Sequence, residues 1–132
     1  MARKKSPIIF STMDALGNQV DLYRSTWEQH IIDPFDGHPD MAGLEDLVLD
    51  VLKNPYEIYR STVDSTACAF VSVPGVGPRP EGVRVVVGFA TTLYEKGSTE
   101  GLVQTAYPID LLRYPNPQIQ KSPFYPYGGK RK

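Results

Sequence analysis

The chain has 132 residues, 41% hydrophobic and 22% charged, which is ordinary for a globular domain and long enough to bury one core. The net charge of −1 conceals an asymmetry. Six of the 14 basic residues lie at positions 3–5 and 130–132, so residues 6–129 hold eight basic and 15 acidic side chains, a net of −7. So acidic a body argues against non-specific nucleic-acid binding, which depends on Lys and Arg contacts to phosphates. A nucleic-acid role would need a local basic cleft or the basic termini.

The composition also predicts location and organisation. No apolar stretch approaches the roughly 20 residues of a membrane helix, and the single cysteine, Cys68, excludes an internal disulfide. Both observations predict a soluble cytoplasmic protein without a membrane partner. Cys68 lies in an apolar run, so we expect a buried hydrophobe rather than a nucleophile. We expect residues 1–7 to form a disordered basic arm, residues 8–112 a single domain and residues 113–132 an extended tail rich in Pro and Tyr.

In the first part of the domain, the sequence patterns predict a β-hairpin followed by two helices. Residues 8–10 and 20–23 have strand patterns and flank a turn. Ser25 and Glu28 fit a capping box for a short helix that must end by Asp33, because Pro34 disfavours helical geometry in the residue before it. Asp40 is the expected cap of a second, amphipathic helix that stops at residues 54–55, Asn-Pro.

In the rest of the domain, the sequence patterns predict strands at residues 57–63, 67–73, 84–89 and 101–107. Helices followed by a run of strands are typical of an α+β fold, with the helices packed on one face of the sheet. We therefore expect an N-terminal hairpin and two helices packed on an antiparallel sheet of about four strands.

The residues suited to chemistry come from two distant segments. The only Trp and both His lie within residues 27–39, and Trp27, His30 and Ile31 share one helical face. Alternation along the last strand places Val103, Thr105 and Tyr107 on one face. If the helix meets that face, His30, Thr105 and Tyr107 converge, and Arg60 can supply a cation.

Such a set suits RNA cleavage by ribose 2′-OH attack, which needs proton transfer and stabilisation of a charged phosphorane. Each of these residues also has a purely structural interpretation. His30 fits a hydrogen-bonded core histidine, Thr105 and Tyr107 fit ordinary strand formers, and Arg60 fits an edge charge. His38, before Pro39, is expected to position the second helix. A metal is only weakly predicted, because the two His and the Asp residues near them could form a loose site whose geometry nothing fixes, and the chain has no CxxC pair and no HExxH. We expect no metal and no cofactor, since a phosphate-binding glycine loop is also absent.

Several short motifs together resemble a known family. They are Trp27-x-x-His30-Ile31, His38-Pro39-Asp40, Asn54-Pro55-x-x-Ile58, the Val-rich segment 84–89 and Val103-x-Thr105-Ala106-Tyr107. In order and spacing they resemble the phage-type branch of the barnase–EndoU–colicin–RelE (BECR) nucleases, over about residues 18–110.

The resemblance implies a small α+β ribonuclease, either a toxin module or a phage protein, that needs no metal and leaves a cyclic phosphate. His30 matches the family's helix histidine and is the expected general acid or base. Thr105 and Tyr107 match the last-strand polar pair and are expected to contact phosphate, and His38 matches the histidine before proline. From the residues alone we expect Arg60 to stabilise charge, and we expect Trp27 and His38 to bind substrate. The implied partners are an RNA substrate and a cognate inhibitor or immunity protein. The alternative is a catalytically inactive protein-interaction domain of a phage or mobile element.

Overall fold

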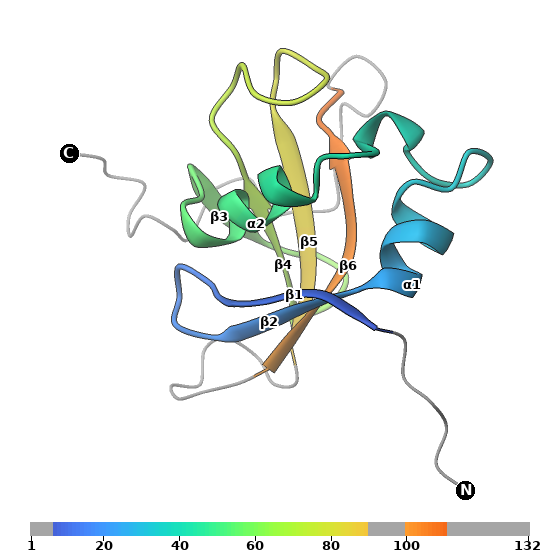
Figure 1. Ribbon diagram of the computed structural model, residues 1–132. Coiled ribbons are helices and arrows are strands. Elements are labelled where there is room, and N and C mark those ends of the chain that lie inside the picture. Colours follow the sequence, from blue (N-terminus) through green and yellow to red (C-terminus); the bar gives the residue numbers. More distant parts are fainter. Residues whose placement is uncertain (1–6, 90–99, 111–132) are drawn as a thin grey trace, which may run out of the picture.

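The computed structural model describes residues 7–89 and 100–110 of the chain (Figure 1). The elements follow in the order β1 (Ile8–Met13), β2 (Gln19–Tyr23), α1 (Arg24–Thr26), the π-helical turn η1 (Trp27–Ile31), the 3-10 turn η2 (Pro39–Met41), α2 (Glu45–Lys53), β3 (Glu57–Arg60), β4 (Ala67–Val71), β5 (Val83–Phe89) and β6 (Glu100–Pro108). None of the helices in these two ranges is long and apolar enough to cross a membrane. The predicted arm and tail lie outside the described residues, Pro7 excepted.

The strands form one six-stranded sheet in the order β1-β2-β6-β5-β4-β3. The expected α+β class is confirmed, but the expected sheet of about four antiparallel strands is wrong in two respects. The hairpin is part of the sheet, and β2 pairs parallel with β6, with Val20 opposite Gly101. An isolated two-stranded hairpin is marginal in water. Joining β6 lets β1–β2 bury Val20 and Leu22, both 0% exposed, in the common core.

The first helix begins and continues differently from the prediction. It starts at Arg24, and the cap residue is Tyr23, which makes no side-chain capping hydrogen bond. The capping box at Ser25 is therefore wrong, because β2 runs straight into the helix and leaves no loop residue there to act as a cap. From Trp27 the turn widens to π geometry, and the N–H of Ile32 donates to the Trp27 carbonyl at 2.9 Å. The predicted end before Pro34 is confirmed.

The second helix starts later than expected. Asp40 lies in η2, whereas α2 begins at Glu45 after Leu44. Between them Gly43 adopts a φ of +82°, a left-handed conformation that glycine tolerates and that interrupts a right-handed helix. The predicted stop at Asn54 is confirmed, since α2 ends at Lys53.

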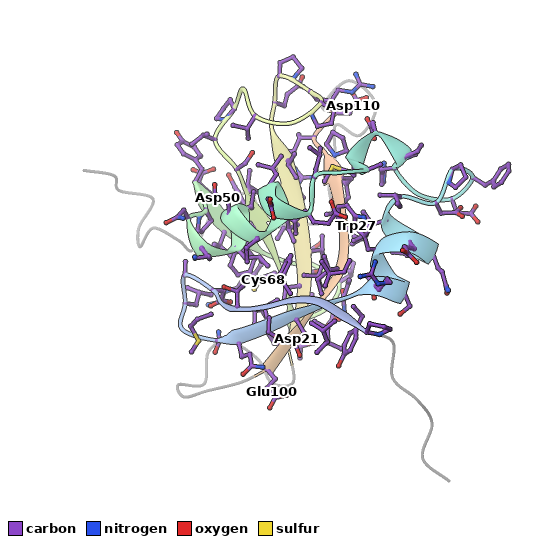
Figure 2. All side chains as sticks on the ribbon, viewed as in Figure 1. Asp21, Trp27, Asp50, Cys68, Glu100 and Asp110 are labelled. Atoms are coloured by element: carbon purple, nitrogen blue, oxygen red, sulfur yellow. The ribbon has the colours of Figure 1, made fainter. Side chains whose placement is uncertain are left out.

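The core lies between α2 and one face of the sheet, called here the core face. A row of paired residues crosses four strands on this face: Ile58, Phe70, Val85 and Ala106, each 0% exposed. Cys68 sits in the next row at 2% exposure, and burial raises the pKa of its thiol to about 12. Its predicted role as a buried hydrophobe is confirmed (Figure 2).

A bulge in β6 decides which side chains reach the opposite face. Val86 of β5 pairs with Thr105, but the next residue, Val87, pairs with Val103, so Gln104 is an extra residue in the ladder. An extra residue reverses the alternation of side chains beyond it. Val103 is consequently buried in the core at 3% exposure, whereas Thr105 and Tyr107 lie on the other face. The expectation that these three residues share a face is wrong for Val103.

Candidate functional site

The sheet face opposite the core face carries the polar side chains and is called here the polar face, defined by Glu57, Tyr59, Arg84, Thr105 and Tyr107. The strand registers place them in two rows. One row runs from Glu57 through Val71 and Arg84 to Tyr107, and the other from Tyr59 through Ala69 and Val86 to Thr105. Four strands thus bring groups up to fifty residues apart in the sequence onto one surface.

Arg84 lies in the middle of the first row and is only 6% exposed. Its Nη1 donates a hydrogen bond to the hydroxyl of Tyr107 at 3.3 Å, and its guanidinium carbon lies 5.5 Å from the centre of the Tyr107 ring. Its Nε is buried and has no hydrogen-bond partner in the part of the chain that the structure describes. Neither ion pair between described residues involves Arg84. Burying a cation without a counter-ion is unfavourable, so this position is suited to an anion.

His38 approaches the same phenol from the segment before η2. The ring centres of His38 and Tyr107 are 5.3 Å apart, with the planes inclined at 38°. The backbone N–H of His38 donates to the Ile31 carbonyl at 2.6 Å, which ties the segment to η1. Gly37 makes this approach possible, because a Cβ there would lie 2.2 Å from the carbonyl oxygen of His30. Imidazole, phenol and guanidinium are thus joined from three separate segments.

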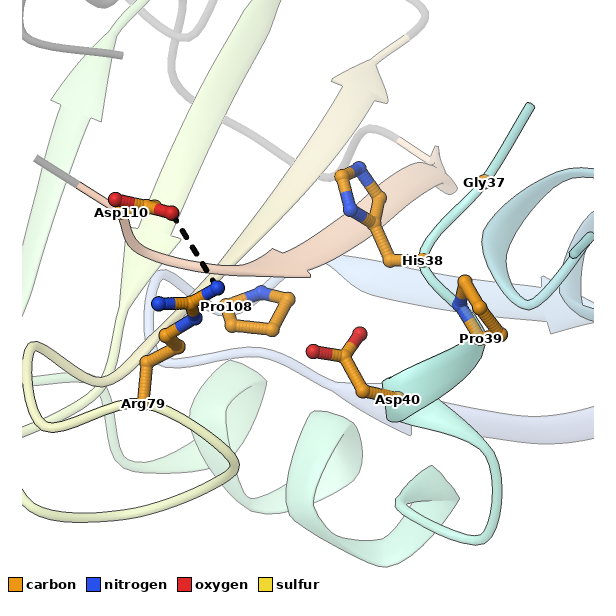
Figure 3. Close-up of a pocket in the computed structure, with 7 residues that line it drawn as sticks. All are labelled: Gly37, His38, Pro39, Asp40, Arg79, Pro108 and Asp110. Carbon is orange, nitrogen blue, oxygen red and sulfur yellow. Dashed lines mark ion pairs between the residues drawn. The ribbon is translucent and has the colours of Figure 1, made fainter. Parts of the chain in front are cut away.

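A small hollow of about 240 Å³ opens beside His38 (Figure 3). Its walls include Pro39 and Asp40 on one side and Arg79, Pro108 and Asp110 on the other. Arg79 and Asp110 form an ion pair at 3.5 Å. The imidazole therefore stands at the border between this hollow and the polar face.

The far end of the polar face holds a second hydrogen-bonded pair. The hydroxyl of Tyr59 donates to Glu57 Oε1 at 2.7 Å. Burial, followed by this bond to the carboxylate, raises the pKa of Tyr59 to about 12, and the nearby charge of Arg84 opposes the increase. Tyr59 thus stays protonated at neutral pH and remains a hydrogen-bond donor.

The structure places the predicted site residues in three regions: the polar face, a second hollow and the core. Thr105 and Tyr107 share the polar face as expected, and the histidine in ring contact with Tyr107 is His38. His30 is exposed and lines a different hollow, formed with Tyr23 and Gln104.

Arg60 and Trp27 do not belong to the polar face. Arg60 pairs with Cys68 and lies two residues from Ile58, so strand alternation directs it to the core face. The shared cleft predicted for Arg60 with Thr105 and Tyr107 is therefore wrong. Trp27 is 3% exposed in the core, where it anchors η1 and has no free surface for a substrate.

The cation that sequence reasoning missed is Arg84. It stands between Val83 and Val85, in a strand otherwise made of valine, glycine and phenylalanine. A charge inside an apolar strand is itself a signal, because unpaired cations are rarely buried. The sequence alone does not show which strand lies next to it.

Comparison of the chain with protein-family models, with curated proteins and with solved structures gave no significant match. Within residues 7–89 and 100–110, no group of three or more His, Cys, Asp and Glu side chains is placed to hold a metal ion.

Proposed function

We propose that the polar face is the active site of a ribonuclease that cleaves RNA by attack of the ribose 2′-hydroxyl on the adjacent phosphorus. The contact of His38 and Arg84 with the same residue, Tyr107, is the observation that carries this proposal. It joins a side chain whose ordinary pKa is near neutrality to a cation that has no carboxylate partner among the described residues. Cleavage of a phosphodiester needs both a proton acceptor and compensation of negative charge.

The roles of the three residues follow from their chemistry. His38 accepts the 2′-hydroxyl proton as the 2′-oxygen bonds to phosphorus. The bond from phosphorus to the 5′-oxygen breaks, and that oxygen takes a proton from water. His38 then returns its proton to the resulting hydroxide. The products are a 2′,3′-cyclic phosphate and a 5′-hydroxyl end.

Arg84 and Tyr107 stabilise the charge that develops on the phosphorane. Arg84 donates to the oxygen of Tyr107, which leaves the phenolic O–H available to donate to a phosphate oxygen. Thr105 adds a second hydroxyl on the same strand and face. Donors arranged before the reaction stabilise developing charge most effectively where water is restricted, and Arg84 is 6% exposed.

A buried cation also accounts for how an acidic chain can act on RNA. Residues 6–129 carry a net charge of −7, so little of the affinity can come from the general field of the protein. Attraction to phosphate would be local, and we expect modest RNA affinity combined with a defined cleavage position.

The test is digestion of a defined RNA by the purified chain in excess EDTA, with His38→Ala compared with the wild type. We expect the wild type to give fragments ending in 2′,3′-cyclic phosphate, and His38→Ala to cut about 100- to 10,000-fold more slowly. Equal rates in the two proteins would refute the role of His38. A folded wild type without any cleavage would refute the proposal and favour the non-enzymatic interaction domain.

A further inference from the structure

A second, larger hollow lies beside the polar face at the other end of β6. It has a volume of about 740 Å³, within the usual range of small-molecule sites. Its walls come from β2, α1, η1, β5, β6 and the loop before β4, and they include Tyr23, His30, Gly88, Leu102 and Gln104. None of these residues takes part in the chemistry assigned to the polar face.

Two irregularities of the backbone meet in this hollow. His30 stands on the π-helical turn η1, and Gln104 is the extra residue of the β6 bulge. Both irregularities are frequent near functional sites, and a bulge redirects the side chain it carries. The side chain of Gln104 lies across Gly88, where an added Cβ would be 2.1 Å from the amide nitrogen.

The lining is suited to a flat, uncharged ligand with hydrogen-bonding edges. Tyr23 and His30 contribute aromatic rings to the lining, and Leu102 contributes an apolar side chain that is 48% exposed. Asp21 and Glu100 stand in the same lining, and their carboxylates disfavour a phosphate there. The Gln104 amide makes no side-chain hydrogen bond to another residue in the described part of the chain. No described residue therefore occupies its donors and its acceptor, which a ligand can use.

The hollow lies next to the part of the polar face where the scissile phosphate is proposed to bind. Gln104 directly precedes Thr105, and the row of Leu102 and Gly88 is the next row along β5 and β6 after that of Thr105 and Val86. Neighbouring rows on one face are roughly 7 Å apart, about the distance from a phosphate to an adjacent base.

We propose that this hollow binds the base of a nucleotide flanking the scissile phosphate, with Gln104 reading its edge and the ring of His30 stacking on it. Proteins that recognise single-stranded RNA commonly combine aromatic stacking with hydrogen bonds to base edges. The inference rests on the proposed ribonuclease function and adds its base selectivity. It also gives His30 a role in binding rather than in proton transfer.

The test compares cleavage of four short RNAs that differ only in the base on one side of a single scissile bond, with a matched set varied on the other side. We expect the wild type to prefer one base, and Gln104→Ala to reduce that preference at least tenfold in kcat/KM. Gly88→Ala, which must displace the Gln104 side chain, should act in the same direction. Gln29→Ala is the matched control, since Gln29 is exposed on η1 and does not line the hollow.

A second measurement separates failure of this inference from failure of the proposed function. The same sequences with 2′-O-methyl riboses cannot be cleaved, and their binding is measured by fluorescence anisotropy. A wild type that cleaves RNA while Gln104→Ala keeps the full base preference would overturn the inference and leave the ribonuclease proposal standing. A wild type that does not cleave, and binds all 2′-O-methyl RNAs equally, would overturn both. A base preference in binding that Gln104→Ala abolishes would support the hollow even without cleavage.

Discussion

The two faces of the central sheet differ in the kind of side chain that they bury: apolar side chains on the core face and a charged one on the polar face. On the core face, β5 contributes Val83, Val85 and Val87, each 0% exposed and packed in the core. On the polar face the same strand contributes Arg84, buried to a similar degree but with one nitrogen lacking a hydrogen-bond partner among the described residues. Burial on the first face stabilises the fold, whereas burying a cation that has no carboxylate partner among the described residues opposes folding on the second. This difference is why the polar face is the candidate functional surface.

Removing a large side chain from the core face should have the largest effect. Phe70 is 0% exposed and Phe35 is 91% exposed. We expect Phe70→Ala to lower the free energy of unfolding by about 3–5 kcal/mol, because it removes apolar contacts and leaves a cavity. Phe35→Ala is the matched control and should change it by less than about 0.5 kcal/mol. Urea denaturation monitored by Trp27 fluorescence measures both, and similar losses in the two variants would break the distinction between core and surface.

On the polar face the expected effect is on activity. We expect Arg84→Met to lower the rate of RNA cleavage by about 100- to 1,000-fold, the usual loss on removing one preorganised charge-stabilising donor. Its free energy of unfolding should not fall by more than about 1 kcal/mol, since methionine fills much of the space without a charge to desolvate. Arg24→Met is the control, because Arg24 is an exposed arginine in an ion pair with Glu28. An Arg84→Met protein that cleaves normally would remove the contrast between the two faces.

The smallest predicted effect concerns Asp14, in the turn between β1 and β2. Asp14 is 5% exposed, and its Oδ1 accepts hydrogen bonds from the N–H groups of Leu16 and Asn18. Burial raises its pKa above the ordinary 3.8. The folded state therefore holds this proton more tightly than the unfolded state, and the stability it contributes falls as the pH rises from 3.8 through the raised pKa.

The Asp14→Asn variant lacks this titrating carboxyl and so does not lose the stability that the wild type loses as the pH rises. The unfolding free energy of the variant minus that of the wild type should therefore rise between pH 4 and pH 7. Urea denaturation across this range measures the difference, and Asp36→Asn, at an exposed position, controls for the loss of one negative charge. A difference for Asp14→Asn that does not change with pH would show that burial does not shift this carboxyl.

Local sequence patterns predict most of the strands and the end of α2, but they do not predict how strands far apart in the sequence pair. The hairpin, the stop at Asn54 and all four later strands could be predicted, because alternation, turn residues and Asn-Pro act over a few residues. The parallel pairing of β2 with β6 joins segments about eighty residues apart, and no local pattern specifies it. The bulge at Gln104 likewise depends on the register with β5, and a single inserted residue was enough to move Val103 off the predicted face.

The candidate site was predictable in its residue types but not in its partners. Thr105 and Tyr107 share a face as strand alternation predicts, whereas which histidine lies beside Tyr107 depends on a helix geometry that the sequence does not show. With ordinary α-helical spacing His30 shares a face with Trp27; in the π-helical turn Trp27 and Ile31 are buried while His30 is exposed. The loop through Gly37 instead brings His38 to Tyr107.

The most direct test of the central claim is where RNA binds. A short RNA with a 2′-O-methyl group at the attacking ribose is titrated into isotopically labelled protein, and chemical-shift changes are followed by NMR. We predict the largest changes at His38, Thr105 and Tyr107, with Val48 and Leu52 of α2 unaffected. Changes centred on α2, or none on the polar face at saturating RNA, would contradict the account.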